Sequence, residues 1–322
     1  FYTDGTHNCV LLVENSRYAE HNGNDSEIII SGNTFDDNCS FIYVRSNNIS
    51  GSNGINVTVT DNTLKASDRA QIDVHDNKVL DSLTFTKNTL EGQKSNYFNL
   101  KYNTCKSGIS FEVTDNKANG PGIDFFVNNN ADLKSLDFEN NSNVGQLQFY
   151  SNWQLTKATV KDNTIGILAM SDLNNIDNLD CSNNGLTQLN ISSQLPKLTT
   201  LDCSKNDLST FDDTNGNLPA LQNLKANGNA KLTKLNLRGK NLSAIDITGC
   251  TNLEEIDVSF NKLTSFDVTG LSKLKNLHIQ GNQLTELNVG GTLLQDAVDT
   301  INASSKTEQE TVGTTTATFY KA

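Results

Sequence analysis

The sequence is poor in the residues that build a compact core. Its 322 residues include 3 Pro, 1 Met and 1 Trp, and hydrophobic residues make up only 35%. So few apolar side chains favour a solenoid, whose core is one coil wide, over a compact globule. No run of about 18 apolar residues occurs, so the sequence predicts no transmembrane span.

Positive charge is also scarce. Asp and Glu number 37 against 25 Lys and Arg, which gives a net charge of -12, and the only arginines are Arg17, Arg45, Arg69 and Arg238. Such a chain repels nucleic-acid phosphates and anionic lipid headgroups. We therefore expect no nucleic acid as the main partner.

Signatures of catalysis and of metal or cofactor binding are missing. The sequence has no Gly-rich phosphate loop and no Cys-x-x-Cys or Cys/His cluster, and none of its 4 His accompanies a nucleophile motif. Cys181 and Cys203 recur at one inward position and are expected to fill a core. We expect no catalytic residue, metal or cofactor. Calcium is a weaker alternative at acidic residues that precede turns, which we interpret as solvated: Asp61, Asp76, Asp115 and Asp162.

One unit recurs along the chain. Two apolar residues flank a variable one, and an Asn follows three residues later, as in Val57-Thr58-Val59-Thr60-Asp61-Asn62. The apolar pair predicts a short strand, and the Asn falls at the corner, where its amide can satisfy backbone groups of stacked coils. Two units are expected to make one coil with two opposed parallel sheets. The predicted ladder consists of Asn33, Asn47, Asn62, Asn77, Asn88, Asn103, Asn116, Asn130, Asn141, Asn152, Asn163, Asn184, Asn206, Asn229, Asn261 and Asn282.

The C-terminal half carries a more specific pattern. Leu198-Thr199-Thr200-Leu201-Asp202-Cys203-Ser204-Lys205-Asn206-Asp207-Leu208 resembles the leucine-rich repeats of bacterial cell-surface proteins, of the internalin J and Bacteroidetes kind. The resemblance covers residues 176–290 and implies a right-handed solenoid with a binding role at the cell surface. Residues 28–130 lack the leading Leu-x-x and look more like a right-handed parallel β-helix.

The predicted fold is therefore one continuous β-solenoid, a hybrid of leucine-rich repeat and parallel β-helix with short caps and few helices. We expect an N-terminal cap at 1–27, β-helix-like repeats at 28–175, leucine-rich repeats at 176–291 and a C-terminal cap at 292–322. In the last segment, Leu293 to Ile301 fit one helical face, and Thr314 to Tyr320 alternate like a strand.

Alternation sorts the outward residues into two faces. One face carries mostly Thr and acidic residues, a common structural choice in sheets. On the other, aromatic residues stand with cations and amides, a composition suited to recognition of a sugar or a protein. The candidate binding residues are Tyr43, Arg45, His75, Lys101, Tyr102, Phe126, Tyr150 and Trp153.

Three functions are open at this point. A non-enzymatic binding scaffold, secreted or at the cell surface and monomeric, for a protein or glycan ligand is favoured by the repeat and by the missing catalytic motifs. An anchor would lie in segments outside this sequence. A carbohydrate-active enzyme, a lyase or hydrolase, is the alternative suggested by the β-helix-like half, and a structural stalk is the third.

Overall fold

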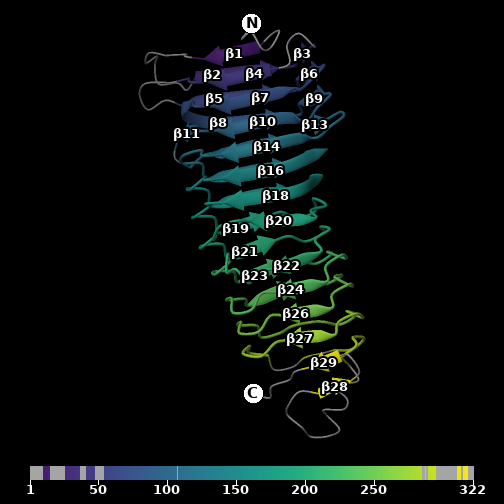
Figure 1. Ribbon diagram of the computed structural model, residues 1–322. Helices are drawn as coiled ribbons and strands as arrows, with labels where there is room; N and C mark the ends of the chain where they lie inside the picture. Colours follow the sequence, from purple (N-terminus) through teal and green to yellow (C-terminus); the bar gives the residue numbers. More distant parts are fainter. Residues whose placement is uncertain are drawn as a thin grey trace. The chain divides into compact units, whose positions relative to one another are not determined.

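The computed structural model describes residues 10–14, 26–36, 41–47, 54–106, 108–284, 287, 289–294, 310–312 and 315–317. The chain divides into two compact units, Phe1–Ile176 with Leu189–Ser193, and Asp177–Gln188 with Gln194–Ala322. Each unit is a parallel β-solenoid, as predicted, and no helix occurs among the described residues (Figure 1). The four segments drawn from the sequence stay predictions.

The first unit has two long parallel sheets. Sheet A contains β1 (Val10–Glu14), β4 (Phe41–Arg45), β7 (Gln71–His75), β10 (Asn96–Lys101), β14 (Ile123–Asn128), β16 (Val144–Tyr150), β18 (Ile165–Ser171) and β20 (Gln188–Ile191). Sheet B contains β2 (Ser26–Ser31), β5 (Ile55–Thr60), β8 (Lys78–Thr86), β12 (Ser110–Thr114), β15 (Ser135–Glu139) and β17 (Lys157–Lys161), with β11 (Thr104–Cys105) beside part of β8. Each coil contributes one strand to each sheet.

A third sheet in the N-terminal coils corrects the two-sheet expectation. Sheet C contains β3 (Thr34–Phe35), β6 (Thr63–Ala66), β9 (Thr89–Gly92) and β13 (Lys117–Ala118). Successive ladder residues Asn33, Asn62, Asn88, Asn116, Asn141 and Asn163 stand 29, 26, 28, 25 and 22 residues apart. The extra residues of the longer coils form the third strand, whereas the 22-residue coil is too short to contain one.

The core of the first unit lies between the sheets. Alternate strand residues are buried, as in Ile55, Val57 and Val59 of β5. A run of Phe residues fills the core with no more than 2% exposure, namely Phe85, Phe98, Phe111, Phe125, Phe138 and Phe149. The rings of Phe85 and Phe98 stack with centroids 3.8 Å apart.

The corner asparagines of the first unit form two ladders, because alternate Asn residues belong to opposite corners. In the first ladder, the Nδ2 of Asn88 donates to the Oδ1 of Asn116 at 3.0 Å, and this step repeats from Asn33 to Asn163. The second ladder runs Asn47, Asn77, Asn103, Asn130 and Asn152. All of these residues except Asn33 are buried, so each amide satisfies polar groups that water cannot reach.

A left-handed residue precedes all 16 asparagines of the predicted ladder. The φ of this residue lies between 53° and 77°, as at Asp61 and Asn129. Gly, Asn and Asp adopt this region most readily, which explains the acidic residues before the corners. Tyr102 and Phe260 are the two aromatic residues that hold it among the described residues.

The second unit is built from coils of 21 to 24 residues. One sheet contains β19 (Asn178–Asp180), β21 (Thr200–Asp202), β23 (Asn223–Lys225) and β25 (Ala244–Asp246). The other contains β22 (Thr210–Asp212), β24 (Lys234–Asn236), β26 (Glu255–Asp257) and β27 (Asn276–His278), then the antiparallel pair β29 (Thr315–Ala317) and β28 (Glu310–Val312). The strand predicted at Thr314 to Tyr320 is described only as β29; Thr292 to Leu294 form a turn, and the rest of the predicted helical face lies outside the described residues.

Some ladder positions of the second unit hold residues other than Asn, and Cys250 and Lys240 are two of these. Cys250 stands at the same distance after β25 as Asn229 does after the paired strand β23. Its thiol donates to the carbonyl of Ala226 at 3.2 Å. Lys240 stands where Asn261 and Asn282 stand in later coils, and its Nζ lies 2.7 Å from the Oδ2 of Asp213, with both side chains only 7% exposed. A thiol and a buried ion pair therefore replace an amide.

Candidate functional site

The candidate site is the solvent-facing side of sheet A, here called the sheet A outer face. Pairing of β4, β7, β10, β14 and β16 places the candidate residues in columns (Figure 1). One column reads Tyr43, Asp73, Asn99, Phe126 and Gln148; the next reads Arg45, His75, Lys101, Asn128 and Tyr150. The register thus brings six of the eight candidates together, as the alternation predicts; their role in binding stays a prediction.

Polar side chains on this face are held by one another. Asp73 accepts hydrogen bonds from the Nδ2 of Asn99 at 2.5 Å and from the Nε2 of Gln71 at 3.0 Å. Gln148 donates through Nε2 to the Oε1 of Gln146 at 2.7 Å. These contacts fix the orientations of carboxylate and amide groups before any ligand arrives, which reduces the entropy lost on binding.

A third column was missed by sequence reasoning. It reads Gln71, Tyr97, Asp124 and Gln146. The guanidinium of Arg69 lies 4.0 Å from the ring centroid of Tyr97, and Phe126 meets that ring edge-on at 6.0 Å. Tyr97 is two residues before Asn99, so strand parity could have revealed it, whereas Arg69 lies in a turn where no periodicity applies.

Asp124 has a perturbed carboxyl group. Desolvation raises its pKa above the ordinary value, and this effect outweighs hydrogen bonding with Gln146 and the nearby charge of Arg69. A carboxyl group with a raised pKa is a feature that general acids share.

Two candidate aromatics lie at the corner beside the face. Tyr102 is 56% exposed and Trp153 is 54% exposed. Tyr102 holds a φ of 57°, a conformation that is unfavourable for an aromatic residue and usually offset by some other gain. The carbonyl of Trp153 accepts a hydrogen bond from Asn175. The corner thus carries two large exposed rings next to the polar columns.

The outer face of sheet B differs as predicted. Its columns read Thr58, Thr84, Glu112, Asp137 and Thr159, and Thr60, Thr86, Thr114, Glu139 and Lys161. Thr60 and Thr86 share a hydrogen bond at 2.9 Å, and Lys161 lies 3.8 Å from Glu139. Short side chains that bond to one another leave little to contact a ligand, so this face serves as a control surface.

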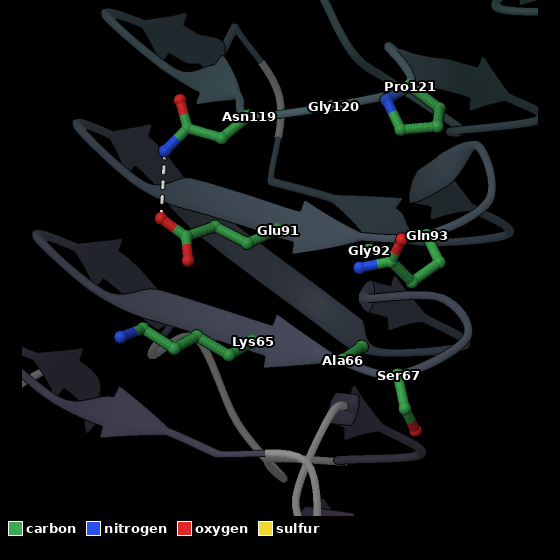
Figure 2. A pocket seen from close by; sticks show the side chains of 9 residues that line it. All are labelled: Lys65, Ala66, Ser67, Glu91, Gly92, Gln93, Asn119, Gly120 and Pro121. Carbon is green, nitrogen blue, oxygen red and sulfur yellow. Dashed lines mark hydrogen bonds between the residues drawn. The ribbon is translucent and has the colours of Figure 1, made fainter.

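A polar hollow of about 560 Å³ lies along sheet C (Figure 2). Lys65 and Glu91 are cross-strand neighbours, and Asn119 donates to the Oε1 of Glu91 at 2.8 Å. Backbone at Gly92 and Gly120 forms part of the lining. The single positive charge of Lys65 is balanced by Glu91, and Glu91 already accepts from Asn119, so the hollow adds no chemistry to that of the sheet A outer face. It was not predicted because sheet C itself was not.

The four described cysteines are buried and free, namely Cys105, Cys181, Cys203 and Cys250. Desolvation by burial raises the pKa of Cys250 to about 11 and raises those of the other three. The fold therefore holds them as thiols, which neither attack substrates nor bind metals.

We expect these four thiols to resist iodoacetamide in the native protein at pH 8, because a raised thiol pKa leaves almost no thiolate there. Peptide mapping by mass spectrometry after labelling checks this site by site. In urea, where the pKa values return to the ordinary range, all four are expected to react fully. Native labelling at any of them would contradict the burial argument.

Among the described residues, no group of three or more His, Cys, Asp or Glu side chains gathers as a metal site would. Asp61, Asp76, Asp115 and Asp162 hold left-handed corner positions with φ of 55° to 58°. His75 contacts Asp76 through Nδ1 at 2.6 Å. No helix in the described part of the chain is long and apolar enough to cross a membrane.

No family model matches the chain, and no curated protein matches its sequence. Similar solved structures include the glycosylated Toll–Spätzle complex of Drosophila, at 18% identity over 80% of this chain and 45% of that chain with a TM-score of 0.25. The TLR13–ssRNA13 complex matches at 14% identity over 79% and 58%, with a TM-score of 0.18. A leucine-rich repeat protein of Leptospira interrogans matches at 15% identity over 83% and 88%, with a TM-score of 0.20.

This chain thus spans about half the length of the first two matched chains. The assignment of the fold as a solenoid rests on the strand pairing within each unit.

Proposed function

We propose that this protein is a binding scaffold of the bacterial leucine-rich repeat kind, secreted or held at the cell surface, that acts without catalysis. Its ligand, a protein or a glycan, contacts the sheet A outer face and the corner beside it. The observation that carries the proposal is the register, which collects aromatic, cationic and amide side chains into adjacent columns.

Physical chemistry supports recognition at this face. Aromatic rings offer apolar area to a sugar ring or a protein side chain, and the amides and carboxylates between them supply oriented hydrogen bonds. The polar groups are already bonded to one another, so the surface is organised before the ligand binds. The side chain of Tyr102 is exposed and its backbone is strained, so this residue contributes nothing evident to the core.

The test compares wild type with the triple variant Tyr102→Ala/Tyr150→Ala/Trp153→Ala on a glycan array and on an array of secreted proteins. We expect the triple variant to give binding signals at least tenfold weaker than wild type, because exposed aromatic contacts are worth about 1–3 kcal/mol when they form hot spots. The matched control is Thr58→Ala/Thr84→Ala/Thr114→Ala on sheet B, which should bind like wild type. Equal binding by both triple variants and wild type would rule the face out.

One specific observation favours the enzyme alternative, namely the raised pKa of Asp124 beside Arg69 and Tyr97. Polysaccharide degradation, followed by reducing ends and by absorbance of unsaturated products, separates it from the scaffold. We expect no turnover. If the protein degrades a polysaccharide and Asp124→Asn abolishes this activity, the protein is an enzyme that uses the same face, and the scaffold proposal is wrong.

A further inference from the structure

Phe260 occupies a backbone position that suits glycine. It precedes the ladder residue Asn261 with a φ of 56°. The equivalent residues one coil before and one coil after are Gly239 and Gly281, with φ of 68° and 72°. A bulky residue at positive φ is a genuine outlier, so the fold alone gives no reason for Phe at this corner.

Burial does not offset the strain, because Phe260 remains 50% exposed. Instead the ring is held between two neighbours. The guanidinium carbon of Arg238 lies 4.4 Å from the ring centroid on one side. On the other, a Cβ added at Gly281 would lie 2.7 Å from the Cδ1 of Phe260, so the ring rests directly on glycine backbone. The ring is therefore positioned firmly while half of it faces solvent.

Arg238 is exposed and has no carboxylate partner among the described residues. Its Nη1 donates to the Oγ of Ser259 at 3.1 Å, and that hydroxyl donates in turn to Asp257. It is the only arginine of the second unit. A guanidinium can take a carboxylate bidentately, and arginine with an aromatic ring is the typical composition of an interface hot spot.

We infer that Phe260 and Arg238 form a docking point in the second unit for a partner protein, which presents an acidic peptide segment. An apolar side chain of that segment packs on the free part of the Phe260 ring, and an adjacent carboxylate pairs with Arg238. Charge complementarity favours this occupant: a nucleic acid needs a row of cations along its backbone, and the corner positions flanking Phe260 are glycines. The site is separate from the sheet A outer face, so the proposed function does not depend on it.

A phage-displayed library of random 12-residue peptides tests the inference. The library is first depleted on the Phe260→Gly/Arg238→Gln variant of the full chain and then selected on wild type. We expect enriched peptides with Asp or Glu beside an apolar residue. A synthetic copy should bind wild type and bind each single variant at least tenfold more weakly, whereas Lys262→Gln, a neighbouring exposed cation, should leave binding unchanged.

Thermal unfolding separates loss of docking from loss of fold. Phe260→Gly is expected to unfold at a higher temperature than wild type, because Gly removes the left-handed strain. A lower unfolding temperature would show that Phe260 serves the fold and would overturn the inference. So would a selection that enriches no peptide over the double variant, or binding of a single-stranded oligonucleotide that the double variant loses.

Discussion

Asn116→Ala is expected to lower the free energy of unfolding of the first unit by about 2–6 kcal/mol. Asn116 is fully buried, donates through Nδ2 to Phe85 and Asn141, and accepts from the backbone and side chain of Asn88. Alanine removes the side-chain partner of the Phe85 carbonyl and of the Asn88 backbone N–H, whereas the Nδ2 of Asn88 keeps the carbonyls of Val59 and Thr86. Each buried polar group without a partner costs about 1–3 kcal/mol.

Urea unfolding followed by circular dichroism measures the loss. The matched control is Asn33→Ala, at the exposed end of the same ladder, where the Oδ1 of Asn62 loses the Nδ2 of Asn33 but keeps the backbone N–H of that position. We expect a loss of less than about 1 kcal/mol there. Equal losses at the two positions would mean that the ladder contributes no more in the interior than at its end.

Lys240→Met should lower the free energy of unfolding by about 3–5 kcal/mol in the second unit, since it leaves the charge of Asp213 buried and unpaired. The backbone N–H groups of Asn217 and Leu218 would remain bonded to that carboxylate, at 2.7 and 3.0 Å, without neutralising it. The double variant Asp213→Asn/Lys240→Met buries no charge, and its amide oxygen keeps an acceptor for one of the two N–H groups. It should therefore recover most of the loss.

Thermal and urea unfolding of the four members of this double-mutant cycle give the coupling energy directly. Lys234→Met is the control, because Lys234 is partly exposed and lies 3.9 Å from Asp212 and 3.4 Å from Glu255, where exposed ion pairs contribute less than about 1 kcal/mol. If Lys240→Met lowered the free energy of unfolding no more than this control, the buried ion pair would not contribute to the stability of the unit.

Much of the fold followed from two local rules. Period-two alternation and a corner Asn predict which residues face the core, and in a parallel stack the same phases also predict the register of the outer columns. The columns through Tyr43 and Arg45 were therefore predictable without coordinates. Between 221 and 245, where the spacing is ambiguous, the structure assigns β23 and β25 to one sheet and β24 to the other.

Other features left no periodic trace. Segments such as Thr63–Ala66 are only two to four residues long, too short to show a strand period, so sheet C looks like loop in the sequence. Asp213 sits in the phase of Leu237 and Val258, and its carboxylate is held there by Lys240, 27 residues along the chain, and by the N–H groups of Asn217 and Leu218. The strain at Phe260 is a backbone property that residue type alone conceals.

The amides of each ladder in the first unit all point the same way. Each hydrogen bond between ladder side chains runs from the Nδ2 of one coil to the Oδ1 of the coil that follows in the chain, and Nδ2 groups such as that of Asn88 also donate to a backbone carbonyl of the coil before. The stack therefore has a direction. A coil added before the first one must supply a side-chain donor, and a coil added after the last one must supply a side-chain acceptor. A terminal segment that closes one end cannot close the other, and transplanted coils must enter in the same orientation to be accepted.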